Sequence, residues 1–299
     1  MKFTVVIPCY QSTKALDNLV ADILRQYNEA CHEIILVQDG PDAQTSVRLQ
    51  NIVSSSAVIR VIQLEQNVGQ HQATLCGLQH ADSLVAAVTM DDDGQVLAQE
   101  IEKLLNKANQ TGADITYGLY KECYHKGLRR GISQLFSKVI SRYSNIPSQG
   151  SSFKLIAPRV LPKLKPFAAP FVCLDEVLAW YADSTVFTEV YHLPRKEGAS
   201  GYSWAKLLRL GWRIMLHYTT IPYRLLIYIG LGLSIGATSI FIKPFFQFGR
   251  LDSSLVDFSK AEWGIMVLGL GMIAIGRIGV IRVKKEKESG TRGYQIKLK

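Results

Sequence analysis

The chain has 299 residues, of which 47% are hydrophobic and 20% are charged. That length and composition exclude a disordered chain and allow one sizeable globular domain with additional elements. The formal net charge of +9, much of it in the C-terminal half, suits nucleic acid, an anionic membrane surface or a phosphorylated substrate.

The cysteines and the first apolar segment indicate a cytosolic setting for the N-terminal part. The five cysteines are scattered and form no Cys-x-x-Cys pair, so neither a disulfide framework nor a zinc site is predicted. Residues 5–7 are too short an apolar run for a signal peptide, and no small-residue cleavage site follows them. We therefore expect this part of the protein in the cytoplasm.

The first half of the chain alternates between strand and helix patterns. Residues 3–7 predict a strand closed by Pro8, and residues 15–27 carry apolar side chains at helical spacing. Further strands are predicted at residues 33–37, 58–64, 84–90 and 114–117, with helical stretches between them, among them residues 101–109. Regular alternation predicts an α/β fold with a doubly wound, mainly parallel sheet and right-handed crossovers.

Beyond Ser203 the composition changes to a membrane-like pattern. Residues 203–216 combine tryptophans with basic residues at helical spacing, which predicts an interfacial amphipathic helix; an ordinary basic surface helix is the alternative. Residues 225–242 and 263–281 are each long and apolar enough to cross a ~30 Å hydrocarbon core, although buried core helices would give a similar pattern.

Glycines and basic residues support the membrane interpretation. Gly230-Leu231-Gly232 and Gly269-Leu270-Gly271 suit close helix packing in lipid. Basic residues crowd before the first apolar stretch and after the second, which predicts that both ends of the hairpin face the cytoplasm. We thus expect a cytoplasmic domain over residues 1–200, the interfacial helix over 201–220, two transmembrane helices over 221–283 and a basic cytoplasmic tail over 284–299.

An acidic cluster organises the N-terminal domain. Asp91, Asp92 and Asp93 follow the predicted strand at 84–90, so they should lie at the carboxyl edge of the sheet, where open α/β sheets bind ligands. Carboxylates spaced Asp-x-Asp can hold a hard divalent cation and leave positions for diphosphate oxygens. A solvated acidic turn is the alternative.

Five segments in chain order resemble family 2 glycosyltransferases that act on polyprenyl phosphate. The likeness is greatest to the branch that transfers aminoarabinose to undecaprenyl phosphate, and dolichol-phosphate mannose synthases are more distant. It implies a GT-A-type domain that transfers a sugar with inversion from a nucleotide-sugar to polyprenyl phosphate, for a cell-envelope glycan or lipid. The shared segments are residues 6–10, 39–40, 67–73, 90–95 and 195–202.

The resemblance also implies roles for individual residues. Asp91, Asp93 and Gln95 would hold Mg²⁺ or Mn²⁺ against the donor diphosphate, and Asp91, Asp93 and Arg195 would carry the catalysis. Donor-binding residues would be Pro8, Tyr10, Asp39, Asn67, Gly69 and Asp91. Acceptor-phosphate residues would be Lys121, Arg129, Arg130, Arg142, Arg195 and Ser200, with lipid-headgroup contacts as the alternative for the arginines.

Two positions depart from or vary within the family pattern. The family usually has Asp-Asp-Gly-Ser after its second strand, whereas this chain has Gln38-Asp39-Gly40-Pro41, so one carboxylate for base or ribose recognition is missing. In the family pattern a lysine-like residue follows Asn-x-Gly, whereas this chain has Gln70 there, as the aminoarabinose branch does. The role of His71 beside it stays open between a residue of the donor loop and a hydrogen-bonded structural histidine, and metal ligation is disfavoured.

Alternative functions remain at this point. A hydroxyl acceptor would need a general base, for which Asp175 and Glu176 are candidates, although a solvated helix face explains them better. A non-catalytic, membrane-bound nucleotide-sugar-binding protein is a second alternative. The preferred hypothesis is a multi-pass protein of the bacterial inner membrane, with a nucleotide-sugar, polyprenyl phosphate and lipid as partners and no nucleic acid; homo-oligomerisation stays open.

Overall fold

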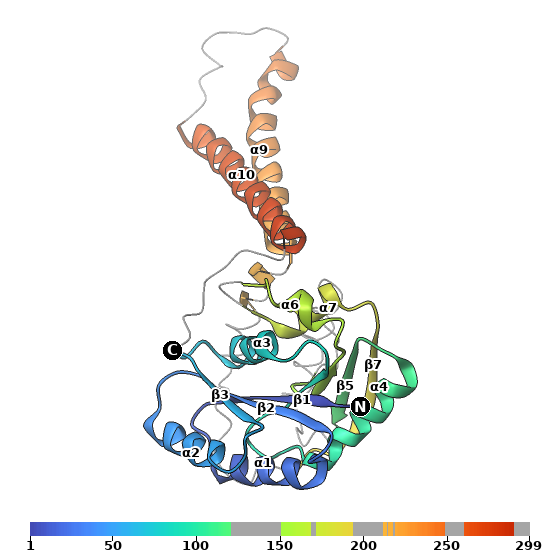
Figure 1. Cartoon of the computed structure of the whole chain (residues 1–299). Helices are drawn as coiled ribbons and strands as arrows, with labels where there is room; N and C mark the ends of the chain where they lie inside the picture. Colours follow the sequence, from blue (N-terminus) through green and yellow to red (C-terminus); the bar gives the residue numbers. More distant parts are fainter. Residues whose placement is uncertain are drawn as a thin grey trace. The chain divides into compact units, whose positions relative to one another are not determined.

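A computed structural model describes residues 1–120, 151–168, 172–193, 212–213, 215–217, 219–248 and 260–289. The chain divides into two compact units, the second of which is Tyr202–Ser289. The first contains a mixed α/β sheet and the second contains two long apolar helices (Figure 1).

Seven strands in the described part of the first unit form one sheet, in the order β3-β2-β1-β4-β6-β5-β7. Most neighbours are parallel, and β6 runs antiparallel to both β4 and β5. The mainly parallel α/β sheet that the sequence predicts is therefore confirmed. The strands are β1 (Phe3–Cys9), β2 (Cys31–Gln38), β3 (Ile59–Gln63), β4 (Ala86–Thr89), β5 (Ile115–Tyr120), β6 (Lys154–Ile156) and β7 (Thr185–Val190).

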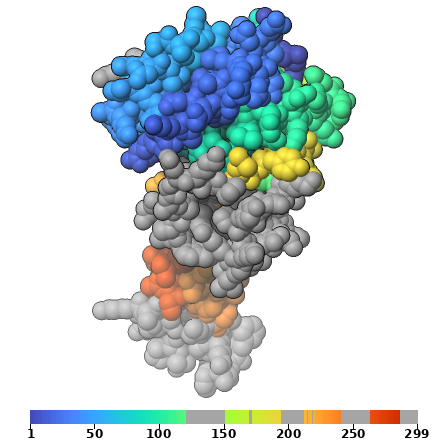
Figure 2. Space-filling model, turned by 90° about the horizontal axis from the view of Figure 1, so that it is seen from below, coloured from blue at the N-terminus to red at the C-terminus, as the bar shows by residue number. Residues whose placement is uncertain are grey.

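Helices cover both faces of the sheet, and two separate apolar clusters result (Figure 1). On one face lie α1 (Lys14–Tyr27), α2 (Ala43–Val53) and α4 (Ile101–Thr111), with η1 (Ala98–Glu100) before α4. Figure 2 shows α1 and α2 side by side on this face, with α4 beside them. On the other face lie α3 (Gln70–His80), α6 (Leu161–Leu164) and α7 (Leu174–Tyr181).

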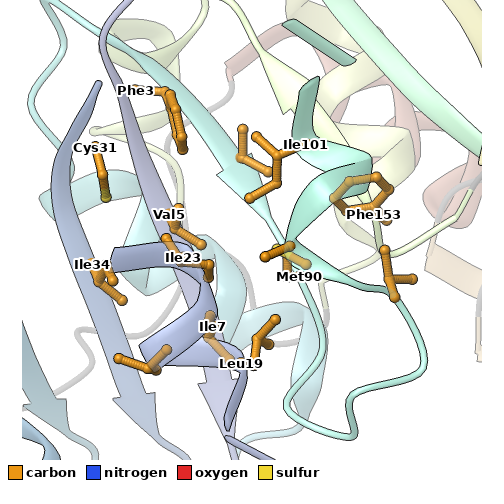
Figure 3. Packing of buried hydrophobic residues seen from close by; sticks show 14 of the residues in the cluster. Phe3, Val5, Ile7, Leu19, Ile23, Cys31, Ile34, Met90, Ile101 and Phe153 are labelled. Carbon is orange, nitrogen blue, oxygen red and sulfur yellow. The ribbon is translucent and has the colours of Figure 1, made fainter. Parts of the chain in front are cut away.

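The apolar cluster under α1 shows why the strand and helix patterns fit together. Leu16, Leu19 and Ile23 lie on one stripe of α1 and pack on alternate residues of β1 (Figure 3). Thr13 caps the helix, because its hydroxyl accepts a hydrogen bond from the Ala15 amide at 3.3 Å. β1 is buried along its whole length, as expected for a central parallel strand.

Two strand boundaries differ from the sequence prediction. Pro8 lies within β1 rather than ending it, because β4 pairs with β1 only as far as Val6 opposite Thr89. The amide hydrogen that Pro8 lacks would point past the end of β4, so no ladder bond is lost. At the other end, β4 begins at Ala86, and Leu84 is 84% exposed in the preceding turn.

The second unit consists of α9 (Ile221–Phe248) and α10 (Lys260–Ser289). Within them, Ile221–Ser239 and Trp263–Lys285 are long and apolar enough to cross a membrane. Large apolar side chains such as Tyr228 and Ile278, each 67% exposed, point away from the helix pair. A core helix of a water-soluble protein would bury such side chains, so a membrane hairpin fits better.

The two helices meet through single glycines. A Cβ atom at Gly230 would lie 2.4 Å from the Gly269 carbonyl oxygen, and one at Gly276 would lie 2.5 Å from the Tyr223 carbonyl oxygen. Gly232 and Gly271 face open space instead. Residues two apart on a helix point to nearly opposite sides, so only one glycine of each predicted pair can face the partner helix.

This packing predicts different effects for two alanine substitutions on α9. Gly230→Ala should lower the thermal unfolding midpoint of the detergent-solubilised protein, because its methyl group meets helix backbone. Gly232→Ala is the matched control and should be neutral or stabilising by roughly 0.5–1 kcal/mol, because alanine favours helix. Equal midpoints for the two variants would contradict the helix contact.

Candidate functional site

The acidic turn lies directly after β4, at the carboxyl edge that β4 shares with β1 and β2. Met90 is buried below it, and its amide donates to the Val6 carbonyl at 3.1 Å. Asp91, Asp92 and Asp93 follow, all partly buried. Three adjacent carboxylates are therefore held close to the sheet rather than on a freely solvated turn.

Two side chains from separate segments hold Asp91. The Ser152 hydroxyl donates to Oδ2 at 2.7 Å, and the Gln70 amide donates to Oδ1 at 2.5 Å. Ser152 reaches this place because β6 is antiparallel, so its beginning meets the end of β4; the Thr89 hydroxyl donates to the Ser152 carbonyl at 2.5 Å. The sequence did not indicate Ser152, since residues 149–153 appeared only as a break.

The other two carboxylates turn in different directions. The Ser12 hydroxyl donates to Asp92 Oδ2 at 2.5 Å, which ties Asp92 to the turn after β1. Asp93 Oδ1 accepts a hydrogen bond from the backbone nitrogen of Gln95 at 3.1 Å, within the acidic turn itself. The Gln95 side-chain nitrogen donates to the Leu193 carbonyl at 3.1 Å, and the Leu193 amide donates back to the Gln95 carbonyl at 2.8 Å.

Burial and like charges make Asp91 the most perturbed carboxylate of the turn. Burial raises the pKa of Asp91 to about 6, and repulsion from Asp93 and Asp92 adds to this, while the Ser152 hydrogen bond and Lys154 act in the opposite direction. Burial also raises the pKa of Asp92. A cation at this turn would relieve the repulsion between the carboxylates.

The turn fits a cation that is shared with a substrate. Among the described residues, no three His, Cys, Asp or Glu side chains converge in a way that could hold a metal ion alone. Asp91, Asp93 and the amide oxygen of Gln95 can supply only part of a coordination shell. Mg²⁺ is commonly held this way, through one or two carboxylates plus substrate phosphates.

Asp39 shapes the loop before α3. Its carboxylate accepts from the backbone amides of Val68 at 2.7 Å and Gly69 at 2.9 Å, and burial raises its pKa against those two bonds. Gly40, with φ of 90°, packs so closely that a Cβ atom would lie 2.6 Å from the Asn67 nitrogen. The structure thus brings together Asp39, Asn67 and Gly69, and Asp39 acts on that loop.

Two further predicted donor residues lie at the end of β1. Pro8 is buried within the strand, and the Tyr10 side chain beyond it is 52% exposed at the carboxyl edge of the sheet. Tyr10 is therefore available to a ligand, whereas Pro8 can act only through the shape of the strand end.

Gln38, which replaces a carboxylate usual in the family, is satisfied internally. Its side-chain nitrogen donates to the Ser46 hydroxyl at 2.8 Å and to the Asp42 carbonyl at 3.2 Å. Its oxygen accepts from the Gln63 side chain at 3.2 Å. With 2% exposure, Gln38 cannot reach a ligand without breaking these bonds.

The expectation that Asp175 and Glu176 form a solvated helix face is wrong. Glu176 is fully buried and accepts from the Trp180 indole at 3.1 Å. Asp175 forms an ion pair with the buried Lys154 of β6, and the same Oδ1 atom accepts from the Tyr117 hydroxyl at 3.0 Å. The sequence could not show this partner, because β6 was not predicted.

Charges around Asp175 keep it ionised. Burial alone would raise the pKa of Asp175, but Lys154 first and His71 second hold it below the ordinary value. His71 lies at the start of α3 and its Nδ1 accepts from the Leu174 amide at 3.4 Å, while burial lowers its pKa. This contact and this burial agree with the interpretation of His71 as a hydrogen-bonded structural histidine.

The predicted acceptor-phosphate residues lie outside the described part of the chain, as does most of the expected interfacial helix. Their roles remain predictions. These residues are Lys121, Arg129, Arg130, Arg142, Arg195 and Ser200.

The Lys154–Asp175 pair predicts a clear stability effect. Asp175→Asn leaves the buried Lys154 ammonium without a counter-charge, so the free energy of unfolding should fall by about 3–5 kcal/mol. The double variant Lys154→Met/Asp175→Asn removes both charges, keeps an acceptor for Tyr117 and should regain most of this loss. Urea unfolding in detergent measures both; a double variant less stable than the single one would contradict the ion-pair argument.

The sequence of this chain is similar to those of known glycosyltransferases. The model of the family Glycosyl transferase family 2 matches residues 4–170. An undecaprenyl-phosphate 4-deoxy-4-formamido-L-arabinose transferase of Proteus mirabilis is 25% identical over 287 residues, 93% of this chain and 87% of its own length. The enzyme of that name from Pseudomonas aeruginosa (strain LESB58) is 30% identical over 242 residues, 78% of this chain and 69% of its own length.

Solved structures agree on the fold. Glucosyl-3-phosphoglycerate synthase from Mycobacterium tuberculosis, crystallised with Mn²⁺, uridine-diphosphate-glucose and phosphoglyceric acid, superposes with a TM-score of 0.54 at 14% identity. The superposition covers 72% of this chain and 77% of that one. The family match over more than half of the chain, the relatives and the shared fold together confirm the resemblance, and the protein belongs to glycosyl transferase family 2.

Proposed function

We propose that the protein transfers a sugar, with inversion, from a nucleotide-sugar to polyprenyl phosphate at the cytoplasmic face of the bacterial inner membrane. The observation that carries this proposal is that two helices follow the glycosyltransferase domain in the same chain, each long and apolar enough to cross a membrane and with most of its apolar side chains exposed. A long isoprenoid stays in lipid, so an enzyme that uses it must bring a soluble donor to the membrane surface. The names of the relatives from Proteus and Pseudomonas, both acting on undecaprenyl phosphate, support this acceptor.

The carboxyl edge of the sheet supplies the donor side of the reaction. Tyr10 and the loop held by Asp39 would flank the nucleotide, and Asp91, Asp93 and the Gln95 amide oxygen would hold Mg²⁺ or Mn²⁺. The cation, when bound, would neutralise the charge that grows on the departing nucleoside diphosphate. Ser152 and Gln70 would keep Asp91 oriented during this step.

A phosphate acceptor matches the carboxylates that the structure describes. A phosphate monoester has a second pKa of about 6, so it is largely ionised at neutral pH and hardly needs a general base. Asp175 is engaged by Lys154 and Tyr117, and Glu176 is buried beside Trp180. These contacts disfavour a hydroxyl acceptor that relies on either carboxylate.

Basic residues around the hairpin support the proposed orientation. Arg213 and Arg224 precede or begin α9, whereas Arg282, Lys284 and Lys285 lie in the last part of α10. Cytoplasmic flanks of membrane helices carry such an excess of Lys and Arg. The glycosyltransferase domain would then share the compartment of its soluble donor.

A donor panel tests the reaction. Purified protein with MnCl₂ and polyprenyl phosphate should convert one of several nucleotide-sugars to a glycolipid, read by lipid chromatography. Asp93→Asn should reduce turnover by at least about a hundredfold, because it removes a proposed cation ligand. Asp22→Asn, the same change at an exposed residue paired with Arg25, is the control and should keep full activity. Full turnover in excess chelator would contradict the cation role.

The raised pKa of Asp91 predicts how cation binding depends on pH. Because the pKa is raised to about 6, Asp91 is mostly protonated below that pH and must lose a proton before it binds Mn²⁺. Affinity for Mn²⁺, measured by electron paramagnetic resonance of the free ion, should level off above about pH 7 and fall by up to about tenfold per pH unit below pH 6. A profile in Asp91→Asn with the same step would show that another group is responsible.

A further inference from the structure

The middle residue of the acidic turn has a different set of contacts from its neighbours. Asp91 faces Ser152 and Gln70, and Asp93 bonds within its own turn. Asp92 instead faces the turn after β1, where its Oδ2 accepts from the Ser12 hydroxyl at 2.5 Å. This contact joins two segments that lie 80 residues apart in sequence.

The turn that Asp92 holds is strained. Gln11, between Tyr10 and Ser12, has φ of 51°, in the left-handed region that non-glycine residues rarely adopt. A residue keeps such a conformation only when its surroundings impose it. A second tether lies on the opposite side, where the Ser12 amide donates to the Thr45 hydroxyl at 3.2 Å. The Tyr10–Ser12 turn is therefore held by the acidic turn through Asp92 and by α2 through Thr45.

The strained turn determines where Tyr10 lies. Tyr10 is the first residue after β1, and its side chain is 52% exposed at the carboxyl edge of the sheet. An exposed aromatic side chain contributes more to binding when its position is set before the ligand arrives, since ordering it afterwards costs entropy. The hydrogen bond from the Ser12 hydroxyl to Asp92 and the one from the Ser12 amide to Thr45 supply that ordering of the backbone.

We propose that Asp92 is a positioning residue for the donor site: it holds the Tyr10–Ser12 turn in its strained form so that Tyr10 is preset against the nucleoside of the donor. In this scheme Asp92 acts on the turn after β1, to which it bonds through Ser12, and the cation is left to Asp91 and Asp93. The inference rests on the proposed function, since it assumes a nucleotide-sugar as donor.

Hydrogen exchange on the full chain, without any ligand, tests the positioning role directly. In Asp92→Ala the backbone amides of residues 10–12 should exchange about three- to tenfold faster than in the wild type, because a charge-assisted hydrogen bond to the turn is lost. Asp92→Asn keeps an acceptor oxygen and should restore most of the protection. Asp93→Ala is the matched control and should leave these amides unchanged. Ser12→Ala removes the partner and should reproduce the Asp92→Ala pattern.

Two solution measurements separate positioning from cation binding. Mn²⁺ alone, titrated by electron paramagnetic resonance, should bind to Ser12→Ala as to the wild type and within about threefold of it to Asp92→Asn, which loses a neighbouring charge but no ligand, whereas Asp93→Ala should weaken binding at least tenfold. With the nucleotide-sugar that the donor panel selects, Ser12→Ala should raise KM for the donor more than it lowers kcat, and adding Asp92→Ala should have little further effect.

Different results would contradict the positioning role of Asp92 and the proposed sugar transfer. Unchanged exchange at residues 10–12 in both Asp92→Ala and Ser12→Ala would overturn the positioning role, and so would loss of Mn²⁺ binding in Asp92→Asn. Absence of Mn²⁺ binding and of sugar transfer in the wild-type protein would overturn the proposed function itself.

Discussion

The site depends on a three-residue strand that runs against its neighbours. β6 lies between β4 and β5, and its antiparallel direction puts Ser152 beside Asp91 at the end of β4. Two residues later, Lys154 is buried against Asp175 at the start of α7. Lys154 also lowers the pKa of Asp91 through its charge. One short strand thus fixes the acidic turn and α7 together, and the geometry of both would change if β6 shifted by one residue.

Three adjacent carboxylates can coexist here because each has a different hydrogen-bond donor. Ser152 and Gln70 serve Asp91, Ser12 serves Asp92, and a backbone amide serves Asp93. Compensation is incomplete, since the pKa of Asp91 stays at about 6 against 3.8 for an unperturbed aspartate. Because the folded pKa is the higher one, ionising Asp91 above pH 6 costs the fold about 3 kcal/mol. A bound cation would offset that cost, so the same burial and charge repulsion that raise the pKa of Asp91 favour cation binding.

Sequence patterns predicted the strands and helices of residues 1–120, and they missed β6, α6, α7 and β7. The first four strands and the helices between them were predictable, since each contains a buried run or an apolar stripe. β6 has only three residues and begins with a lysine, so no pattern marks it. That omission also caused the wrong expectation for Asp175 and Glu176, because the partner of Asp175 lies on β6. Gln38 was recognised as a departure, but its partners Ser46 and Gln63 were not visible from sequence, since they come from α2 and β3.

The placement of carboxylates connects the chemistry with the membrane hairpin. A general base needs an accessible lone pair and a pKa near the working pH. Asp175 has Oδ1 bonded to Lys154 and Tyr117 and a pKa held below its ordinary value, and Glu176 lies inside the core. Neither meets both requirements, so neither can act as a general base. An acceptor that is already ionised would need no such base. A lipid-linked phosphate is ionised without help from the protein. It is also confined to the membrane, which α9 and α10 are long and apolar enough to cross. Under the proposed function, the lack of a suitable base at α7 and the apolar hairpin would both follow from a phosphate acceptor that is carried in lipid.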